Sequence, residues 1–348
     1  MGYDVAFIGH LDDVQGYREA LEALRGPDRP PLTMERVRQL IPRMQPMPIC
    51  DVALRSARGF DRRGIYVDAF LLPTPTWALR TALAKVQAAC RQAAETGARI
   101  GVLGGFSSIV GEQAGARLSD EFGLPFTTGN TLTAAVIATQ IERAVSDLAA
   151  PTIAVVGAAG DVGSGVCRIL HGKGFELLLV GRARPPLERL SAELGGQRVR
   201  SWAEAAQKAD SVVLVASTMH GAISLEHVRK HTRVLDAGHP PNAQPRPGLR
   251  YAMAGRVTHL HKPVGEIPQF IEQGGAGEFH ACLVEGEVLA FEQRWEAFSS
   301  GRGNIRPEQA NEILGLARRH GIEPAPLHWA ADGLSGRPHE HAEVAAGR

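Results

Sequence analysis

The chain alternates short runs of β-branched and aliphatic residues with longer segments whose apolar residues recur at helical spacing. The clearest unit is a strand-like run at 153–156, a glycine turn, and then Val162, Val166 and Ile169 at helical spacing. The same patterns predict further strands at 3–8, 99–103, 175–180, 210–215 and 232–236, and helices at 16–25, 77–94, 131–149, 186–195, 278–295 and 307–320. This order of elements predicts an α/β fold.

The predicted elements divide the chain into three folded parts and a tail. An N-terminal α/β domain at 1–150 is expected to take the substrate. A Rossmann-type domain with a doubly wound parallel sheet at 151–270 is expected to take a dinucleotide, and C-terminal helices follow at 271–330. Residues 331–348 are rich in Gly, His, Arg and Ala without periodicity, so we expect disorder there.

The glycine turn carries the main evidence for a cofactor. Gly157 permits a tight turn, Gly160 lets backbone N–H groups approach a pyrophosphate, and Gly163 lets the helix pack closely on the strand. A purely structural turn is the alternative, but the strand before and the helix after it favour dinucleotide binding. The residues expected to contact the cofactor here are Gly157, Ala159, Gly160, Asp161, Val162 and Gly163.

The end of the next strand favours one nicotinamide cofactor over the other. Arg182 and Arg184 follow the run at 175–180, and no acidic residue accompanies them. An acidic residue at this point binds the ribose 2′-OH of NAD, whereas arginine accommodates the 2′-phosphate of NADP. We therefore predict NADPH; the alternative is a solvated basic turn.

Two later strand ends should face the same crevice. The strand at 210–215 runs into Ala216 and Ser217, and the strand at 232–236 runs into Gly238 and His239. Ala216, Ser217 and Gly238 are predicted to lie near the nicotinamide. His239 could serve as a proton donor, although a loop histidine before two prolines is more often structural.

Composition narrows the functional class without choosing it. The 348 residues are 44% apolar and 22% charged with a formal net charge of +1, which gives no indication of a nucleic-acid partner or a polybasic membrane anchor. No apolar run approaches the length of a membrane span, and no signal peptide is evident. Four widely spaced cysteines suggest free thiols in a cytoplasmic enzyme, and no cluster has the spacing of a metal site.

One cysteine stands where chemistry is plausible. Cys282 follows a glycine-rich segment and falls in the first turn of the helix predicted at 278–295. Unpaired N–H groups and the helix dipole at that position favour a thiolate, so we expect a lowered pKa. The alternative is a small buried apolar residue. His280 is two residues away and is a doubtful base, because it would point elsewhere on a helix.

Small hydroxyl residues cluster at two turns of the first domain. Ser107 and Ser108 follow the strand at 99–103, and Thr127 and Thr128 precede the helix at 131–149. Such residues line ligand crevices in α/β proteins. Thr128 or Asn130 could equally be the N-cap of that helix, so both interpretations stay open.

Several blocks in one order resemble the long-chain acyl-[acyl-carrier-protein] reductases of cyanobacteria, which make fatty aldehydes. The blocks are Leu-Gly-Gly-Phe-Ser-Ser-Ile at 103–109, Phe-Thr-Thr-Gly-Asn-Thr at 126–131, Val-Val-Gly-Ala-Ala-Gly-Asp-Val-Gly-Ser at 155–164, Val-Ala-Ser at 215–217 and Ala-Cys at 281–282. The similarity extends from residue 8 to about residue 326, with a weaker block at 298–302.

The resemblance implies a reaction and a role for Cys282, which falls where the family's nucleophile falls. In that family a cysteine takes an acyl group from an acyl-carrier protein or CoA thioester, and NADPH reduces the acyl-enzyme to an aldehyde. The hydroxyls of Ser107, Ser108, Thr127, Thr128 and Ser217 are then candidates to stabilise the oxyanion. An enzyme that consumes the aldehyde is a further partner this reaction could have.

Departures from the family pattern indicate a different acyl group. Leu132 and Ala135 stand where the family usually has His and Tyr, and residues 258–271 match poorly. We hypothesise a shorter chain or an acyl group on a biosynthetic carrier protein. Two other functions stay open: an NADP-dependent alcohol or keto-acid dehydrogenase without a covalent intermediate, and a noncatalytic NADP-binding sensor or scaffold.

Overall fold

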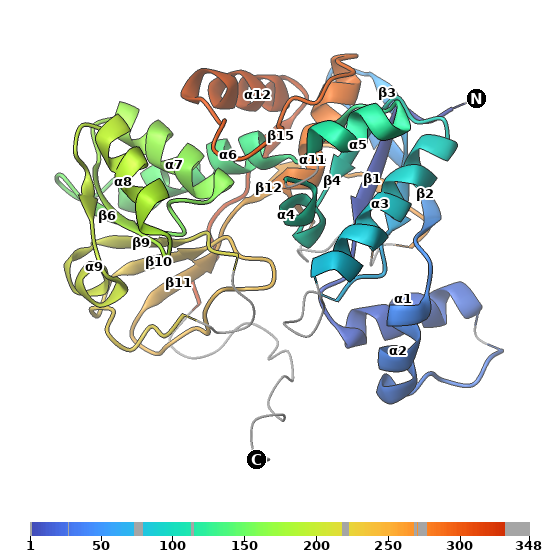
Figure 1. The fold of residues 1–348 in the computed structure, drawn as a ribbon, viewed down its shortest axis with the longest axis horizontal. Coiled ribbons are helices and arrows are strands. Elements are labelled where there is room, and N and C mark those ends of the chain that lie inside the picture. The colour runs from blue at the N-terminus through green and yellow to red at the C-terminus, as the bar shows by residue number, and fades with distance from the viewer. Residues whose placement is uncertain are drawn as a thin grey trace.

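The computed structural model describes residues 2–26, 28–72, 79–112, 115–217, 223–267, 270 and 277–330. Two α/β lobes stand side by side, and α6 (Asn130–Val145) runs between them beneath α12 (Pro307–Arg319) (Figure 1). The α/β class and the doubly wound parallel sheet predicted from the sequence are confirmed. The predicted disordered tail lies outside the described residues.

The first lobe is built on a six-stranded mixed sheet. In sheet order its strands are β13 (Val264–Gly265), β2 (Met47–Arg55), β3 (Asp61–Asp68), β1 (Val5–Gly9), β4 (Ile100–Leu103) and β5 (Phe126–Thr127). The strands β3, β1, β4 and β5 are mutually parallel, whereas β2 pairs antiparallel with both of its neighbours, β3 and β13. Its helices are α1 (Val14–Arg25), α2 (Met34–Leu40), the 3-10 turn η1 (Ile41–Arg43), α3 (Leu79–Glu95), α4 (Phe106–Glu112) and α5 (Gly115–Phe122).

The hairpin of β2 and β3 was not among the predicted elements, although its pattern is readable. Cys50, Val52 and Leu54 point inward in alternation with exposed residues, which is the two-residue period of a half-buried strand. The start of the helix predicted at 77–94 lies partly outside the described residues. β13 falls within the range predicted for the second domain, yet it pairs with β2 of the first sheet.

The second lobe is a wholly parallel six-stranded sheet. In sheet order its strands are β11 (Arg250–Met253), β10 (Arg233–Asp236), β9 (Ser211–Leu214), β6 (Thr152–Val156), β7 (Glu176–Val180) and β8 (Arg198–Val199). Read from β8, this is the 3-2-1-4-5-6 order of dinucleotide-binding domains, whose crevice opens between the first and fourth strands, β6 and β9. The accompanying helices are α7 (Asp161–Gly172), α8 (Arg184–Glu193) and α9 (Trp202–Lys208).

The C-terminal segment joins the lobes through a three-stranded antiparallel sheet. Its strands are β14 (Glu278–His280), β12 (Arg256–His259) and β15 (Ile322–Pro324), and α11 (Ala281–Phe291) follows β14 directly. The prediction of helix from residue 278 was therefore wrong at its first turn. α11 packs directly on the first sheet. The approach is so close at Gly286 that an added Cβ would lie 2.8 Å from the Val102 side chain.

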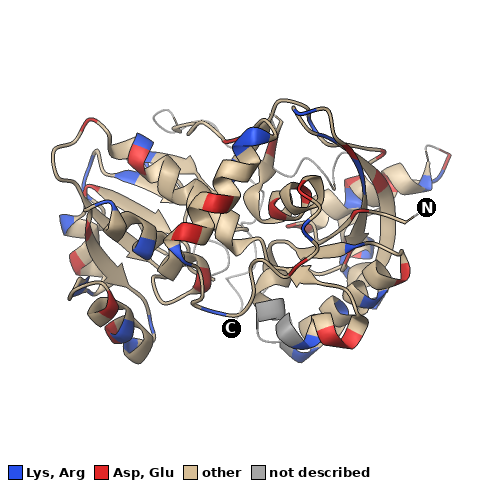
Figure 2. Ribbon diagram, turned by 90° about the horizontal axis from the view of Figure 1, so that it is seen from above, with Lys and Arg blue, Asp and Glu red and all other residues tan. Residues whose placement is uncertain are grey.

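Charges of both signs are interspersed over the two lobes (Figure 2). This distribution matches the net charge of +1 and shows no continuous basic stripe along the described ribbon. No helix in the described part of the chain has the length and apolar character needed to cross a membrane.

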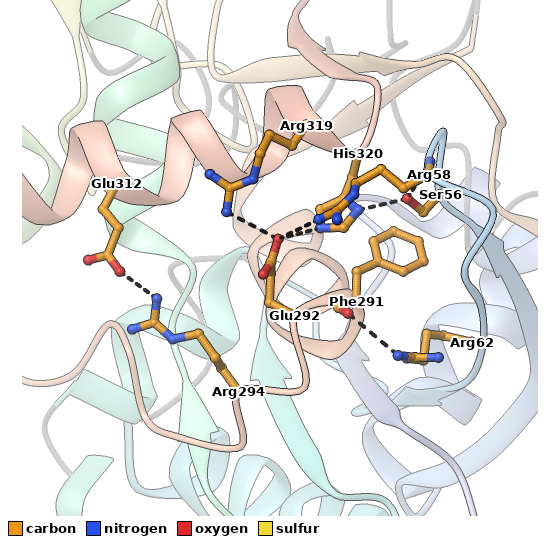
Figure 3. Close-up of polar contacts among 9 residues, drawn as sticks. All are labelled: Ser56, Arg58, Arg62, Phe291, Glu292, Arg294, Glu312, Arg319 and His320. Carbon is orange, nitrogen blue, oxygen red and sulfur yellow. Dashed lines mark hydrogen bonds and ion pairs between the residues drawn. The ribbon is translucent and has the colours of Figure 1, made fainter.

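A polar cluster fixes the end of α12 to the first lobe (Figure 3). His320 Nδ1 lies 2.7 Å from the Ser56 hydroxyl in the β2–β3 turn, and its Nε2 lies 2.8 Å from Glu292 Oε1 at the end of α11. Serine, histidine and carboxylate also form hydrolytic triads. Here, however, His320 is buried, the backbone N–H of Arg58 donates to the same Ser56 oxygen, and neither cavity described below includes these residues. The cluster therefore joins three elements.

Replacing His320 with alanine should lower the free energy of unfolding by about 2–4 kcal/mol, because two buried hydrogen bonds and the stacking on Phe291 are lost. Urea titration measures this. The surface ion pair between Arg318 of α12 and Glu323 of β15 supplies a control, and Arg318→Ala should cost no more than about 0.5 kcal/mol. Equal effects of the two variants would contradict the structural role of His320.

The His320 contribution should also depend on pH. Burial lowers the pKa of His320 below its usual value near 6.5, although Glu292 acts in the opposite direction. The folded state thus prefers the neutral ring, and the contribution is full above pH 6.5 and is lost as pH falls through the folded pKa. The difference in stability between the wild type and His320→Ala should shrink on acidification, and urea titrations at several pH values test this.

Candidate functional site

The glycine turn lies where β6 runs into α7, at the reversal of strand order. Gly157 has φ +96°, which favours glycine, and its N–H donates to Val180 O at 2.9 Å. A Cβ at Gly163 would lie 2.2 Å from Gly157 O, so only glycine allows this close packing of helix on turn. A Cβ at Gly160 would meet only Gly157 O, at 3.1 Å, which leaves its outer side open. Gly157, Ala159, Gly160 and Val162 are partly exposed there.

The ends of β9 and β10 meet this turn as predicted from the sheet topology. A Cβ at Gly157 would be 2.8 Å from Ala216 Cα, so the turn after β6 is in close contact with the end of β9. Asn242, fully buried, receives a hydrogen bond from Ala216 N and donates one to Ala216 O, and it packs against Gly238. Ser217 is exposed at the same edge. Sequence reasoning missed Asn242, and nothing in its local pattern distinguishes it.

Asp161, predicted to contact the cofactor, directs its carboxylate into the protein instead. Its Oδ2 accepts a hydrogen bond from Asn130 Nδ2 at 2.9 Å, and its Oδ1 accepts one from Gly303 N at 2.8 Å. The carboxylate therefore ties α7 to the start of α6. Arg182 and Arg184 are exposed beyond β7, and neither forms an ion pair with any residue that the structure describes.

Cys282 lies on the wall of a cavity where both sheets end. The cavity has an empty volume of about 220 Å³. It receives residues from the ends of β1 and β4 in the first lobe, from the end of β10 in the second lobe, and from the start of α11. Its lining consists of Gly9, His10, Gly104, Gly105, His239, His280, Cys282 and Leu283.

Two glycines allow the start of α11 to sit at this junction. A Cβ at Gly104 would lie 2.5 Å from Leu283 Cδ2, and a Cβ at Gly129 would lie 1.8 Å from the backbone oxygen of Cys282. Gly129 also has φ +69°, in the left-handed region. The glycines of both hydroxyl-rich turns thus hold Cys282 in place.

The expected lowering of the Cys282 pKa was wrong for the protein without ligand. Burial raises the pKa of this thiol, whereas hydrogen bonds from the backbone N–H groups of Gly105, Leu283 and Cys282 itself act in the opposite direction. The position of Cys282 at the start of a helix favours a thiolate, but burial of the sulfur has a larger effect on the pKa in the opposite direction. The three N–H groups remain directed at the sulfur.

A histidine–aspartate pair, with one residue from each lobe, lies beside the cavity. His239 Nε2 lies 2.7 Å from Asp12 Oδ1. Burial acts to raise the pKa of Asp12, but the imidazoles of His239, His10 and His280 lower it to about 2. Asp12 is therefore ionised and holds the His239 ring beside the cavity. The sequence analysis did not identify Asp12, because it lies far from His239 along the chain.

The other two histidines differ in their contacts. His10 receives a hydrogen bond at Nε2 from Phe106 N at 2.9 Å, and its Nδ1 lies 3.2 Å from Leu11 O, so its ring is committed to the backbone. The ring of His280 lies 4.0 Å from that of His239, and its buried Nε2 has no hydrogen-bond partner in the described residues. Burial, His239 and Arg256 lower the pKa of His280, so the ring is neutral near pH 7.

The four hydroxyl candidates of the first lobe lie in different environments. Thr127 donates to the buried carboxylate of Glu285 at 2.5 Å, and Thr128 donates to Ser299 O at 3.4 Å. Ser108 donates to Gly105 O at 2.8 Å, whereas the buried Ser107 hydroxyl has no partner in the described residues. The N-cap of α6 is Gly129 without a side-chain hydrogen bond, so the capping interpretation of Thr128 and Asn130 was wrong.

Comparison of the sequence with known proteins shows which family the chain belongs to. No protein-family model matches the sequence. The chain is 35% identical over 302 residues to the long-chain acyl-[acyl-carrier-protein] reductase of Synechococcus elongatus, across 81% of this chain and 88% of that protein. The chain belongs to the long-chain acyl-[acyl-carrier-protein] reductase family. The resemblance stated from the sequence blocks is confirmed at the level of the family.

Other similarities to this member of the reductase family are more partial. The chain is 29% identical over 262 residues to aminotransferase PigE of a Serratia species, across 70% of this chain and 30% of that protein. A semialdehyde dehydrogenase NAD-binding protein from Cupriavidus necator, solved with calcium and NAD, is 26% identical over 37% of this chain and 50% of its own, with a TM-score of 0.27.

Membership of this reductase family and the strand order of the second sheet together make this protein an oxidoreductase that uses a nicotinamide cofactor. The turn fits such a cofactor, because its exposed backbone and the open side of Gly160 would admit a pyrophosphate at the N-terminus of α7. Within the described ranges, no group of three or more His, Cys, Asp and Glu side chains is arranged to hold a metal ion.

Proposed function

We propose that the protein reduces an acyl thioester to an aldehyde with NADPH, through an acyl-enzyme on Cys282. The observation that carries the proposal is the position of this thiol. It stands in a cavity formed by the strand ends of both lobes, beside His239 at the end of a cofactor-domain strand. A nucleophile at this junction can meet a substrate from one lobe and a cofactor from the other.

In the first step the sulfur of Cys282 attacks the thioester carbonyl. A new sulfur–carbon bond forms, the bond to the donor sulfur breaks, and the thiol proton leaves on the donor's thiol. The N–H groups of Gly105 and Leu283, which are directed at Sγ, stabilise the thiolate form from which the attack starts. The donor is the thioester of an acyl-carrier protein or of CoA.

In the second step the carbonyl carbon of the acyl-enzyme is reduced, and NADPH bound at the glycine turn would supply the hydride. His239, whose Nε2 pairs with Asp12 at 2.7 Å, donates a proton to the oxygen of the thiohemiacetal and takes it back as the carbon–sulfur bond breaks. The aldehyde leaves, Cys282 is released as a thiolate, and a proton from water restores the thiol. The unpartnered hydroxyl of Ser107 is a further candidate donor to the oxyanion.

A second cavity offers room for the acyl chain. It has an empty volume of about 380 Å³, which includes space open to solvent, and it shares His280 and Leu283 with the first cavity, so the two cavities adjoin. Its lining is mainly apolar and consists of Phe7, Val52, Tyr66, Pro263, Phe270, Phe279, His280, Leu283, Val284 and Glu287. An acyl group on Cys282 can extend into it and bury its methylene groups.

The proposal is tested by intact-protein mass spectrometry after mixing with acyl-CoA or acyl-carrier protein in the absence of NADPH. We expect an acyl mass on Cys282 that disappears when NADPH is added. NADPH oxidation without any adduct would instead support a dehydrogenase with no covalent intermediate. Tight NADPH binding without an adduct or turnover would support a cofactor sensor.

The choice of NADPH gives a separate prediction. Replacing Arg182 and Arg184 together with serine should raise the KM for NADPH about 10–100-fold and leave the KM for NADH nearly unchanged, because charge-assisted hydrogen bonds to the 2′-phosphate are lost. Steady-state kinetics with both cofactors measures this. Arg189→Ser, an exposed arginine on the same helix, is the matched control. Equal changes for both cofactors would contradict the assignment.

A further inference from the structure

The second cavity is not uniformly apolar. Tyr66 and Phe270 face each other across 5.1 Å between ring centroids, and Phe279, Leu283 and Val284 complete an apolar wall. Glu287 also lines this cavity. It follows Leu283 by four positions on α11, so both side chains lie on the face of the helix that borders the cavity.

One carboxylate oxygen of Glu287 is buried without a hydrogen-bond partner in the part of the chain that the structure describes. The Glu287 side chain is 2% exposed, and this oxygen is Oε1. His259 Nδ1 lies 3.5 Å away, beyond normal hydrogen-bond length, and the side chain of His259 is also 2% exposed. His259 Nε2 is likewise without a partner in the described part of the chain. A buried carboxylate is costly unless hydrogen bonds compensate it.

We infer that Glu287, which lines the cavity, recognises a hydroxyl group on the acyl chain, so the preferred substrate is a hydroxylated acyl thioester. This inference rests on the proposed function. A hydroxyl donates one hydrogen bond and accepts others, whereas a carboxylate only accepts and an imidazole can donate. A hydroxyl in the cavity can therefore donate to the carboxylate of Glu287, whereas His259 does not line the cavity and borders Glu287 at 3.5 Å. The surrounding rings and aliphatic side chains would bury the methylene groups on either side.

The position of Glu287 restricts where the hydroxyl lies. Cys282 and Glu287 are five residues apart on α11, or roughly 7.5 Å along the helix axis at 1.5 Å per residue. The side chain of Glu287 tilts back toward the start of the helix, which shortens this distance. The hydroxyl should therefore be several carbons from the carbonyl, within a chain of modest length, rather than on the adjacent carbon.

The test compares acyl-CoA thioesters of equal length with and without a hydroxyl, which is moved one carbon at a time along the chain. The wild type should show at least a tenfold higher kcat/KM for one hydroxyl position than for the unsubstituted chain. Glu287→Leu should remove this preference by lowering kcat/KM for the hydroxylated chain, and Glu287→Gln should retain part of the preference. Val284→Leu, which narrows the same cavity without changing its polarity, is the control, and should alter chain-length preference only.

Binding provides a measurement that does not need turnover. Calorimetric titration of the same thioesters into Cys282→Ser should show the hydroxyl preference, and Glu287→Leu in that background should abolish it. Equal binding and reduction of both series by the wild type would overturn the hydroxyl inference while leaving the proposed reaction intact. A hydroxyl preference in binding, with no aldehyde formed from any thioester, would support the hydroxyl inference and overturn the proposed reaction. A loss of stability in Glu287→Leu with unchanged selectivity would show that the pair is only structural.

Discussion

Replacing Cys282 with serine is expected to lower kcat and kcat/KM for thioester reduction together by at least about a thousandfold. The serine hydroxyl is a far weaker nucleophile toward a thioester, and no other described cysteine lines the cavity. NADPH consumption with an acyl thioester measures the rate. Mass spectrometry should find no adduct on the variant, while NADPH fluorescence should show that cofactor binding is retained.

Cys90 supplies the control for this substitution. It is fully buried in α3, away from both cavities, and burial raises the pKa of its thiol beyond the usual range. Cys90→Ala should retain both adduct formation and turnover, apart from a modest loss of stability. Turnover and an acyl adduct that persist in Cys282→Ser would show that another group is the nucleophile.

The cofactor turn could be predicted because its information is local. Gly157, Gly160 and Gly163 lie within one strand–turn–helix unit, in which Gly157 takes a positive φ and Gly163 packs against the Gly157 carbonyl. The strand order of the second lobe then follows from regular alternation of strands and helices. The same reasoning placed Ala216 and Gly238 at one crevice, since ends of parallel strands meet at one edge of a sheet.

The surroundings of Cys282 could not be predicted in this way. Asp12 and His239 come from different lobes, and no local pattern relates them. The first turn predicted for α11 became β14, because Phe279 and its neighbours pair with β12 and satisfy their backbone hydrogen bonds there. The thiol pKa was misjudged for the same reason, since burial depends on residues distant in sequence.

The nucleophile and the cofactor helix are connected through the start of α6. Asp161, the first residue of α7, accepts a hydrogen bond from Asn130, and Asn130 follows Gly129, which packs on the backbone of Cys282. On the other side, Glu285 of α11 accepts hydrogen bonds from Thr127 and from the N–H of Leu132. The start of α6 therefore positions α7 and α11 together, and Gly129 is its closest contact with the thiol-bearing residue.

Gly129→Ala should reduce both stability and acyl transfer. At φ +69° an alanine costs about 1–2 kcal/mol, and its Cβ would also lie 1.8 Å from the Cys282 oxygen, a backbone atom that cannot rotate away. The start of α6 or of α11 must therefore move. A displacement of about 1 Å at a reacting group can cost about a hundredfold in rate, so we expect at least that loss in adduct formation.

The conformational cost can be separated from the close approach by a second glycine. Gly123 has φ +62° and no heavy atom within 4 Å of an added Cβ, so Gly123→Ala carries the φ penalty alone. Thermal unfolding should show a larger loss of stability for Gly129→Ala than for Gly123→Ala, and the rate of acyl-adduct formation should fall only in Gly129→Ala. If both variants transferred the acyl group at the wild-type rate, close packing at Gly129 would not be what positions Cys282. A selective loss in Gly129→Ala would instead show that acyl transfer requires this glycine because it sets the position of the nucleophile.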